Sequence, residues 1–160
     1  MKSVRIGFTG HQGLDAGTEI SVLVALEALL SQVLPVTGIS SLAEGSDQIF
    51  ARAVLDSGGT LEIVVPCKEY EQTFNSEIAL SNYRSLLSRA SRVIELDYLA
   101  PTEEAFWAAG QRVVLECERV VAVWDGKPAV GLGGTADVVE FARKRGMQVD
   151  VVWPLGASRK

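Results

Sequence analysis

The sequence predicts a single α/β domain with a Rossmann-like, doubly wound and mainly parallel sheet of about six strands, covered by helices on both faces. Segments typical of strands alternate with segments typical of helices from one end of the chain to the other. The strand segments are short, continuous and rich in Val and Ile, as is typical of parallel strands buried on both faces. The length of 160 residues suits one domain with a sizeable core. We therefore assign residues 1–155 to this domain and expect residues 156–160 to form a frayed tail.

Six apolar runs predict the strands. The first run ends at Gly10, the third at Pro66, and the last is followed by Pro154. Proline ends a strand because it lacks the amide hydrogen that the sheet needs, and glycine weakens a strand because it has no side chain to pack. The predicted strands span residues 4–9, 37–42, 61–65, 92–96, 120–124 and 149–153.

Helical spacing of apolar residues predicts five helices between these strands. Pro35 closes the first helix, Ser46 is interpreted as the N-cap of the second, and Gly146 stops the fifth. Residues 101–104, with the sequence PTEE, form a strong start for the fourth helix. The predicted helices span residues 19–33, 46–55, 77–89, about 101–117, and 135–145.

The composition excludes several classes of site. The net charge of −5 argues against a nucleic acid partner, and the basic residues 143–145 are explained by the dipole at a helix end. Cys67 and Cys117 lack metal-ligand spacing and the chain has one histidine, so we expect no metal and no cofactor. The cysteine usage fits a reducing cytoplasm, and no apolar run has the length of a membrane span or the features of a signal peptide. We therefore expect a cytoplasmic protein without membrane contact.

The loop after the first strand is the first candidate ligand site. Parallel sheets bind ligands beyond the carboxyl ends of their strands, so the loops after the first, second, third and fifth strands should share one rim. Here Gly10, His11 and Gln12 precede a second glycine. These residues either contact a ligand or form a turn that needs glycine for its backbone shape. The dinucleotide-binding pattern G-x-G-x-x-G is absent from this loop.

The loop after the second strand contains a carboxylate that helix capping does not explain. Ser46 either caps the helix, with Asp47 at the positive end of the helix dipole, or contacts a ligand together with Gly45. Glu44, next to Gly45, lies on the same predicted rim and suits ribose hydroxyls or a base amino group.

The loop after the third strand offers aromatic residues to the same rim. Tyr70 and Phe74 either stack on a base or hold the loop against the protein body. Cys67 has no histidine beside it in the sequence, so the residues give little support for a thiolate nucleophile.

The glycine loop after the fifth strand is the most informative segment. Gly133, Gly134 and Thr135 open a helix, and backbone N–H groups at such a position bind anions. Asp137, however, lies in the first helical turn and would repel a phosphate. Asp137 and Glu140 share a helix face and, with Asp125 at the strand end, could act at a glycosidic carbon. The alternative is that Asp137 compensates the helix dipole and Glu140 is an exposed surface residue.

Two motifs resemble those of known families. Residues 39–47, ISSLAEGSD, with the continuation to residue 60, resemble the SGLARGID strand–helix unit of DNA-processing protein A. Residues 131–135 resemble the Gly-Gly-x-Gly-Thr motif of the Lonely Guy (LOG) phosphoribohydrolases, and residues 7–11 are similar to the first-strand loop of related branches. Together they resemble the SLOG superfamily of Rossmann-like nucleotide-binding domains. Some of its bacterial members are proposed sensors or processors of nucleotide signals.

The sequence also departs from the LOG pattern. Val138 stands where the second acidic residue of the LOG motif is expected, Arg112 lacks the sequence context of the catalytic arginine, and Gln12 stands where related loops often have arginine. The resemblance therefore implies nucleotide binding more than phosphoribohydrolase activity. Nucleoside deoxyribosyltransferases give a more distant analogy, and they also place a glutamate on the helix after the last motif.

Three functions are considered from the sequence. The first is a binding domain for a nucleotide or nucleotide-derived ligand. The second is an N-glycosidase that releases a base from a nucleoside monophosphate, with Asp137 or Glu140 as its catalytic carboxylate. The third is a structural role in which the glycines only form turns. A homodimer is expected by resemblance, and the apolar residues 106–109 are either its interface or part of the core.

Overall fold

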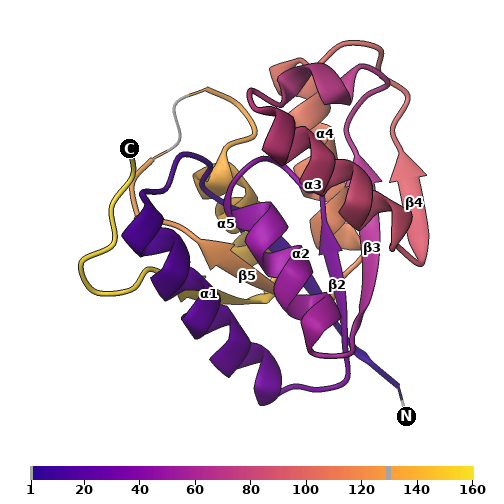
Figure 1. Cartoon of the computed structure of the whole chain (residues 1–160). Coiled ribbons are helices and arrows are strands. Elements are labelled where there is room, and N and C mark those ends of the chain that lie inside the picture. Colours follow the sequence, from indigo (N-terminus) through magenta and orange to yellow (C-terminus); the bar gives the residue numbers. More distant parts are fainter. Residues whose placement is uncertain (1, 129–130) are drawn as a thin grey trace.

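The computed structural model describes residues 2–128 and 131–160, and it contains a six-stranded parallel sheet (Figure 1). The strands lie in the order β4-β3-β2-β1-β5-β6. Their bounds are β1 Val4–Gly10, β2 Val36–Ser40, β3 Thr60–Val65, β4 Arg92–Glu95, β5 Arg119–Val123 and β6 Gln148–Val152. All six strands were predicted from the sequence, with ends that differ by one or two residues.

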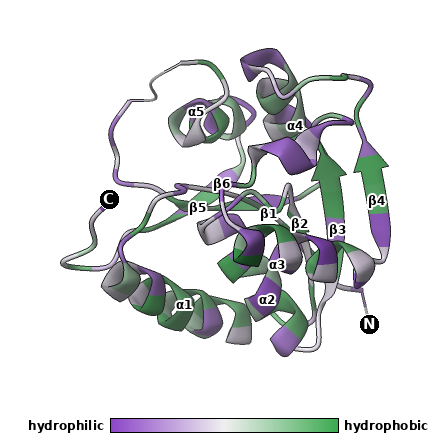
Figure 2. Cartoon of the chain, turned by 45° about the horizontal axis from the view of Figure 1, so that its top comes forward, coloured by the Kyte–Doolittle hydropathy of each residue, from purple (hydrophilic) through white to green (hydrophobic). Residues whose placement is uncertain are grey.

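Five α-helices and one short 3-10 helix connect the strands. Helices α1, α2 and α3 cover one face of the sheet, and α4 and α5 cover the other (Figure 2). The bounds are α1 Ala16–Ser31, α2 Ser46–Asp56, η1 Tyr70–Thr73, α3 Glu77–Ser88, α4 Glu103–Leu115 and α5 Thr135–Lys144. The prediction of a doubly wound α/β sheet is therefore confirmed. Within the described residues, every helix is too short or too polar to cross a membrane.

The strand order reverses at β1, and this reversal positions the site. The chain moves outward from β1 to β4 on one side, then crosses to β5 and β6 on the other side of β1. The loops that leave β1 and β5 therefore diverge to opposite faces of the sheet and leave a crevice between them. Residues 11–15 and the segment after Val123 border this crevice.

In the core under α1 and α2, an aromatic ring of β1 stacks on an aromatic ring of α2. Phe8 stacks on Phe50 of α2 with ring centroids 4.5 Å apart. Gly38 in β2 lets α2 approach closely, since a Cβ atom there would lie 2.8 Å from Val54 and 2.9 Å from Phe50. The absence of a side chain at this strand position thus fixes the height of α2 above the sheet.

The N-termini of the five α-helices fall into two groups. Side-chain oxygens of Asp15, Ser76 and Thr102 cap α1, α3 and α4. No side chain caps α2, which begins after Gly45, or α5, which begins after Gly134. The two uncapped N-termini both border the crevice.

The interpretation of Ser46 as an N-cap is wrong. Gly45 occupies the cap position with a φ of +102°, a backbone conformation that favours glycine. Ser46 is the first residue inside α2, and its hydroxyl donates to the backbone oxygen of His11 at 2.7 Å. The serine thus joins α2 to the loop after β1.

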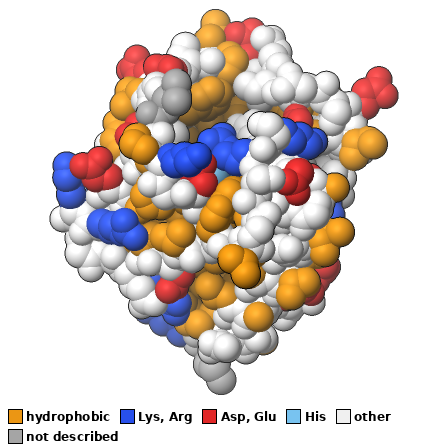
Figure 3. Space-filling model, turned by 90° about the vertical axis from the view of Figure 1, so that its left-hand side faces the viewer, with side chains coloured by type: hydrophobic (Ala, Val, Ile, Leu, Met, Phe, Trp, Pro, Cys, Tyr) orange, Lys and Arg blue, Asp and Glu red, His pale blue; other side chains and the backbone are white. Residues whose placement is uncertain are grey.

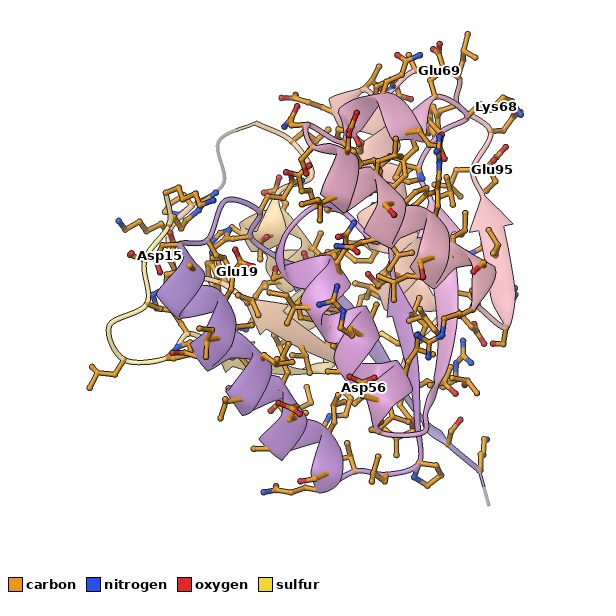
Figure 4. The ribbon with its side chains drawn as sticks, in the orientation of Figure 1. Asp15, Glu19, Asp56, Lys68, Glu69 and Glu95 are labelled. Carbon is orange, nitrogen blue, oxygen red and sulfur yellow. The ribbon has the colours of Figure 1, made fainter. Side chains whose placement is uncertain are left out.

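The C-terminal residues, for which we expected a frayed tail, return to the start of α1. Arg159 forms an isolated bridge with Leu14, and the Lys160 amide donates to the Gly13 oxygen at 2.6 Å. Ser158 hydrogen-bonds to Asp15, which Figure 4 labels at the N-terminus of α1 beside the tail. This pairing brings Arg159 to the edge of the crevice.

Replacing Gly38 with alanine should destabilise the fold by about 1–3 kcal/mol, because the added methyl group would overlap Val54 and Phe50. Urea denaturation measures the change. The matched control is Gly17→Ala in the first turn of α1, where the nearest atom to an added Cβ is 3.6 Å away. The control should be neutral or stabilising by up to about 1 kcal/mol. Equal effects of both substitutions would contradict this account of α2 packing.

Candidate functional site

A cleft of about 480 Å³ lies over the carboxyl ends of β1, β2, β3 and β5. The loops after all four strands contribute to its wall, as predicted from the alternating pattern of strands and helices. Figure 3 shows a hollow with hydrophobic side chains in the upper part of one face, bordered below by a row of basic side chains. The predicted residues that line the cleft are Gly10, His11, Gln12, Gly133, Gly134 and Thr135.

The glycine loop before α5 is shaped by its packing on α4. Gly133 has a φ of +86°, and a Cβ atom there would lie 2.8 Å from the backbone nitrogen of Trp107. Only glycine fits this position without displacing α4. The loop therefore presents the uncapped first turn of α5 to the cleft, with its N–H groups available to an anion.

Asp137 hydrogen-bonds to the glycine loop. Its Oδ2 accepts from the backbone N–H of Gly133 at 2.9 Å. This contact reaches back from the first turn of α5 and fixes the loop before the helix. The alternative interpretation of Asp137 as a first-turn acid at the positive helix end accounts for this arrangement.

His11 and Asp125 face each other at the point where β1 and β5 end. The His11 Nε2 accepts from the Asp125 backbone N–H at 3.1 Å and lies 3.2 Å from the Asp125 carboxylate. Burial and the positive charge of Arg159 lower the pKa of His11, and together they outweigh the opposite effect of Asp125. A neutral imidazole agrees with its role as acceptor of the Asp125 N–H.

The carboxylate of Asp125 has three neighbours. Burial opposes its ionisation, but a hydrogen bond from the Lys127 N–H at 3.0 Å and the nearby His11 and Arg159 lower its pKa overall. Arg159 lies 3.8 Å from Oδ2. Asp125 is thus engaged in holding the loop after β5 and the tail together, and it is not among the residues that line the cleft.

Two basic residues that were not predicted as site residues also line the cleft. Lys127 follows β5, and Arg159 comes from the C-terminal tail. Arg159 escaped notice because the tail carries no signal of regular structure, and only its pairing with Leu14 brings it to the rim. Lys127 lies two residues after Asp125 and could have been found as a basic residue in the loop already singled out.

Asp47 is a further cleft residue whose role differs from that inferred from the sequence. Only 6% of the residue is exposed, and its Oδ2 lies 3.4 Å from the Ser40 hydroxyl and 3.3 Å from the Ala43 amide. Burial raises the pKa of Asp47 to about 7, although these hydrogen bonds act in the opposite direction. An acid in the first turn of a helix looks like a dipole-compensating surface residue in the sequence, and nothing local reveals its burial.

The remaining predicted site residues lie outside the cleft wall. Glu44 accepts from the Asn75 backbone N–H at 2.9 Å and so joins the second loop to the third. Gly45 approaches the backbone of Gln12, where a Cβ atom would be 2.8 Å from Cα. Ser46 is fully buried. Glu140 is exposed on α5, pairs with Lys144 at 3.0 Å and does not line the cleft.

The aromatic residues of the third loop pack against the protein body. Tyr70 is buried and makes edge-to-face contacts with Phe74 and Tyr83, with centroids 5.4 and 5.5 Å apart. One wall of the cleft is formed by Tyr70 itself. In residues 106–109, Phe106 packs on the core around Tyr70 and Trp107 packs on Phe141, so these residues belong mainly to the core.

Metal ligation finds no support in the part of the chain that the structure describes. Among residues 2–128 and 131–160, no three side chains of His, Cys, Asp or Glu are grouped so that they could hold a metal ion. Among these residues, the cleft offers backbone amides, the cations Lys127 and Arg159, the carboxyl groups of Asp47 and Glu103, the His11 imidazole and apolar walls.

No family model and no curated protein matches the sequence, but solved structures match the fold. DNA processing protein A from Streptococcus pneumoniae has a TM-score of 0.69 and 18% identity, and the match covers 95% of this chain and 51% of that one. This chain thus spans about half the length of that protein. DNA processing protein A from Helicobacter pylori has a TM-score of 0.70 and 15% identity, with 98% and 68% covered.

A third similar structure is TM1055, a structural genomics target, with a TM-score of 0.59 and 14% identity over 91% of this chain and 72% of that one. These likenesses show that the chain shares the Rossmann-like fold of these structures, in agreement with the fold predicted from the sequence. At such low identity the comparison defines the fold, while function has to be argued from the site.

The expectation that nucleic acid is not a partner is contradicted by these neighbours. The DNA processing protein A from Helicobacter pylori has a single-stranded DNA binding mode. Our expectation rested on the net charge of −5. Net charge is a property of the whole chain, however, whereas binding depends on the local field. Lys127 and Arg159 line the cleft together with Asp47 and Glu103, so the net charge of the whole chain does not describe this surface and no longer excludes nucleic acid as a partner.

The raised pKa of Asp47 predicts a specific dependence of stability on pH. The folded protein retains a proton that the unfolded chain releases, so this group costs stability increasingly as the pH rises from about 4 to about 7. Asp47→Asn carries no charge at any pH. Relative to the natural protein, it should gain stability over this window, by at most about 4 kcal/mol.

Urea denaturation of both proteins at about pH 5 and about pH 8 tests this. Comparing the variant with the natural protein at each pH cancels the titration of His11, which is present in both. Asp56→Asn, an exposed acid at the other end of α2, is the control and should show no pH-dependent gain. A stability difference that is the same at both pH values would contradict the assigned pKa.

Proposed function

We propose that this protein binds a nucleotide or nucleotide-derived ligand in the cleft at the carboxyl ends of its strands, as a sensor or processor of nucleotide signals. One observation carries the proposal. The uncapped N-terminus of α5 and the cations Lys127 and Arg159 face the same cleft at the point where the strand order reverses. Helix N–H groups and nearby cations stabilise an anionic group such as a phosphate.

The anionic group is assigned to the first turn of α5. The Gly133 N–H already donates to Asp137, so the N–H groups of residues 134–137, at the cap and in the first turn, are those left for a ligand. This arrangement answers the objection that Asp137 would repel a phosphate. The hydrogen bond from Gly133 partly offsets its charge, and Asp137 is not part of the cleft wall.

The size and composition of the cleft fit a mononucleotide. A volume of about 480 Å³ lies within the usual range for small-molecule sites. Away from α5, the wall is formed by apolar and aromatic residues, among them Phe8, Pro66 and Phe106. A ligand with one charged end and one flat apolar end matches this division.

The catalytic role of Asp137 and Glu140 as carboxylates of an N-glycosidase stays a prediction. Glu140 is exposed, pairs with Lys144 and does not line the cleft, so the enzyme alternative now depends mainly on Asp137. A turnover assay decides this alternative: the protein is incubated with nucleoside monophosphates, and released base is measured by chromatography. Release that is lost in Asp137→Asn would support the enzyme.

The binding test uses nucleoside monophosphates, NAD, cyclic nucleotides and a single-stranded oligonucleotide. A ligand that binds only the folded state should raise the melting temperature, with about 2.7 kcal/mol of stabilisation at a concentration 100 times its Kd. Arg159→Gln should weaken binding about tenfold, since it removes one charge-assisted hydrogen bond. Arg52→Gln, the same change on the exposed side of α2, should leave binding unchanged. If no compound in the panel shifts the melting temperature or is consumed, the proposal fails.

A further inference from the structure

The cleft contains an acidic side chain that phosphate binding does not use. Asp47 lies at the start of α2, beside the end of β2, whereas the proposed anion site lies at the start of α5 beside β5. Because β2 and β5 flank β1 on opposite sides, the two groups face the cleft from opposite sides. A ligand anchored at α5 and extending across β1 reaches the carboxyl group of Asp47.

Asp47 is held in position but has capacity left for a ligand. The Ser40 hydroxyl and the Ala43 N–H both donate to Oδ2, at 3.4 and 3.3 Å, and the Ser41 backbone also donates to the carboxyl group. A carboxylate with two oxygens can accept more hydrogen bonds than these. Among the described residues no Lys, Arg or His forms an ion pair with Asp47. A carboxyl group that is 94% buried without a cation is costly, and donors supplied by a ligand would lower this cost.

The surroundings of Asp47 suit a flat ring. Tyr70 of η1 and Phe106 of α4 supply aromatic walls, and Pro66 after β3 supplies an aliphatic one. Apolar walls with one convergent polar group are the usual form of a site that recognises the edge of a ring. Polar contacts in such a pocket fix which ring edge is accepted.

We propose that Asp47 accepts a hydrogen bond from an exocyclic amino group of the base, so that the protein selects amino-bearing nucleotides over their oxo counterparts. This inference rests on the proposed function and names its ligand class. The ionised carboxylate accepts an N–H, whereas a carbonyl group at the same ring position offers no donor and meets an acceptor. The comparison is therefore made at about pH 8, above the pKa of about 7 that burial gives Asp47. A site of this kind discriminates because the wrong base leaves buried polar groups unpaired.

The test compares pairs of nucleotides that differ at this one group. Binding of AMP and IMP, and of CMP and UMP, is measured by calorimetry on the natural protein, and pyrophosphate serves as a probe of the anion site alone. We expect AMP and CMP to bind about tenfold more tightly than IMP and UMP. Pyrophosphate should bind regardless of residue 47.

Two variants of Asp47 separate recognition from folding. Asp47→Ala should bring the AMP to IMP affinity ratio close to one, and Asp47→Asn should lower this ratio as well, because its amide can either donate to a carbonyl group or accept from an amino group. Asp56→Ala, at the opposite end of the same helix (labelled in Figure 4), is the matched control and should leave the ratio unchanged. Unaltered pyrophosphate binding shows that each variant is folded.

Each outcome has a defined meaning. Equal binding of AMP and IMP by the natural protein, or a preference that persists in Asp47→Ala, overturns the role of Asp47 while nucleotide binding itself stands. If neither pyrophosphate nor any nucleotide binds, the proposed function fails and this inference fails with it. If Asp47→Ala does not fold, the ratios in the natural protein and in Asp47→Asn still decide the question.

Discussion

Residue His11 connects the three segments that form the cleft. Its backbone N–H donates to Val123 at the end of β5 at 3.0 Å, and its backbone oxygen accepts from the Ser46 hydroxyl at the start of α2. Its imidazole accepts from the Asp125 N–H in the loop after β5. The reversal of strand order creates the crevice, but these hydrogen bonds fix the separation of its walls. Gly45 and Ser46 matter through this connection, since α2 begins where the loop after β1 holds it.

The fold was largely predictable because it depends on the periodic spacing of apolar residues along the sequence. Six strands and five helices produce repeating apolar patterns, and parallel topology follows from their alternation. The cleft location followed as well, because a doubly wound sheet leaves its crevice at the carboxyl ends. The glycine loop before α5 could also be recognised, because a glycine cluster between a predicted strand and a predicted helix is typical of few structures.

The individual side chains of the site were harder to predict. Ser46 was interpreted as the N-cap because serine is common at that position, but Gly45 is the N-cap and Ser46 is the first residue of the helix. Asp47 resembled an ordinary first-turn acid, and its burial results from the fold of residues 40–43 over it. Glu140 follows Asp137 by three residues in α5, but it pairs with Lys144, four residues further on, and does not line the cleft. Such distinctions depend on three-dimensional contacts that spacing does not encode.

The position of Arg159, close to Asp125 and His11, links ligand binding to the protonation of His11. Arg159 lowers the pKa of His11 through its charge, and it also faces the cleft where we place an anionic ligand. A bound anion would offset this positive charge and add its own negative potential, so the imidazole would take up protons more readily. Ligand occupancy and the ionisation of His11 would then be thermodynamically linked. The heat of binding would depend on the ionisation enthalpy of the buffer at a pH near the titration of His11.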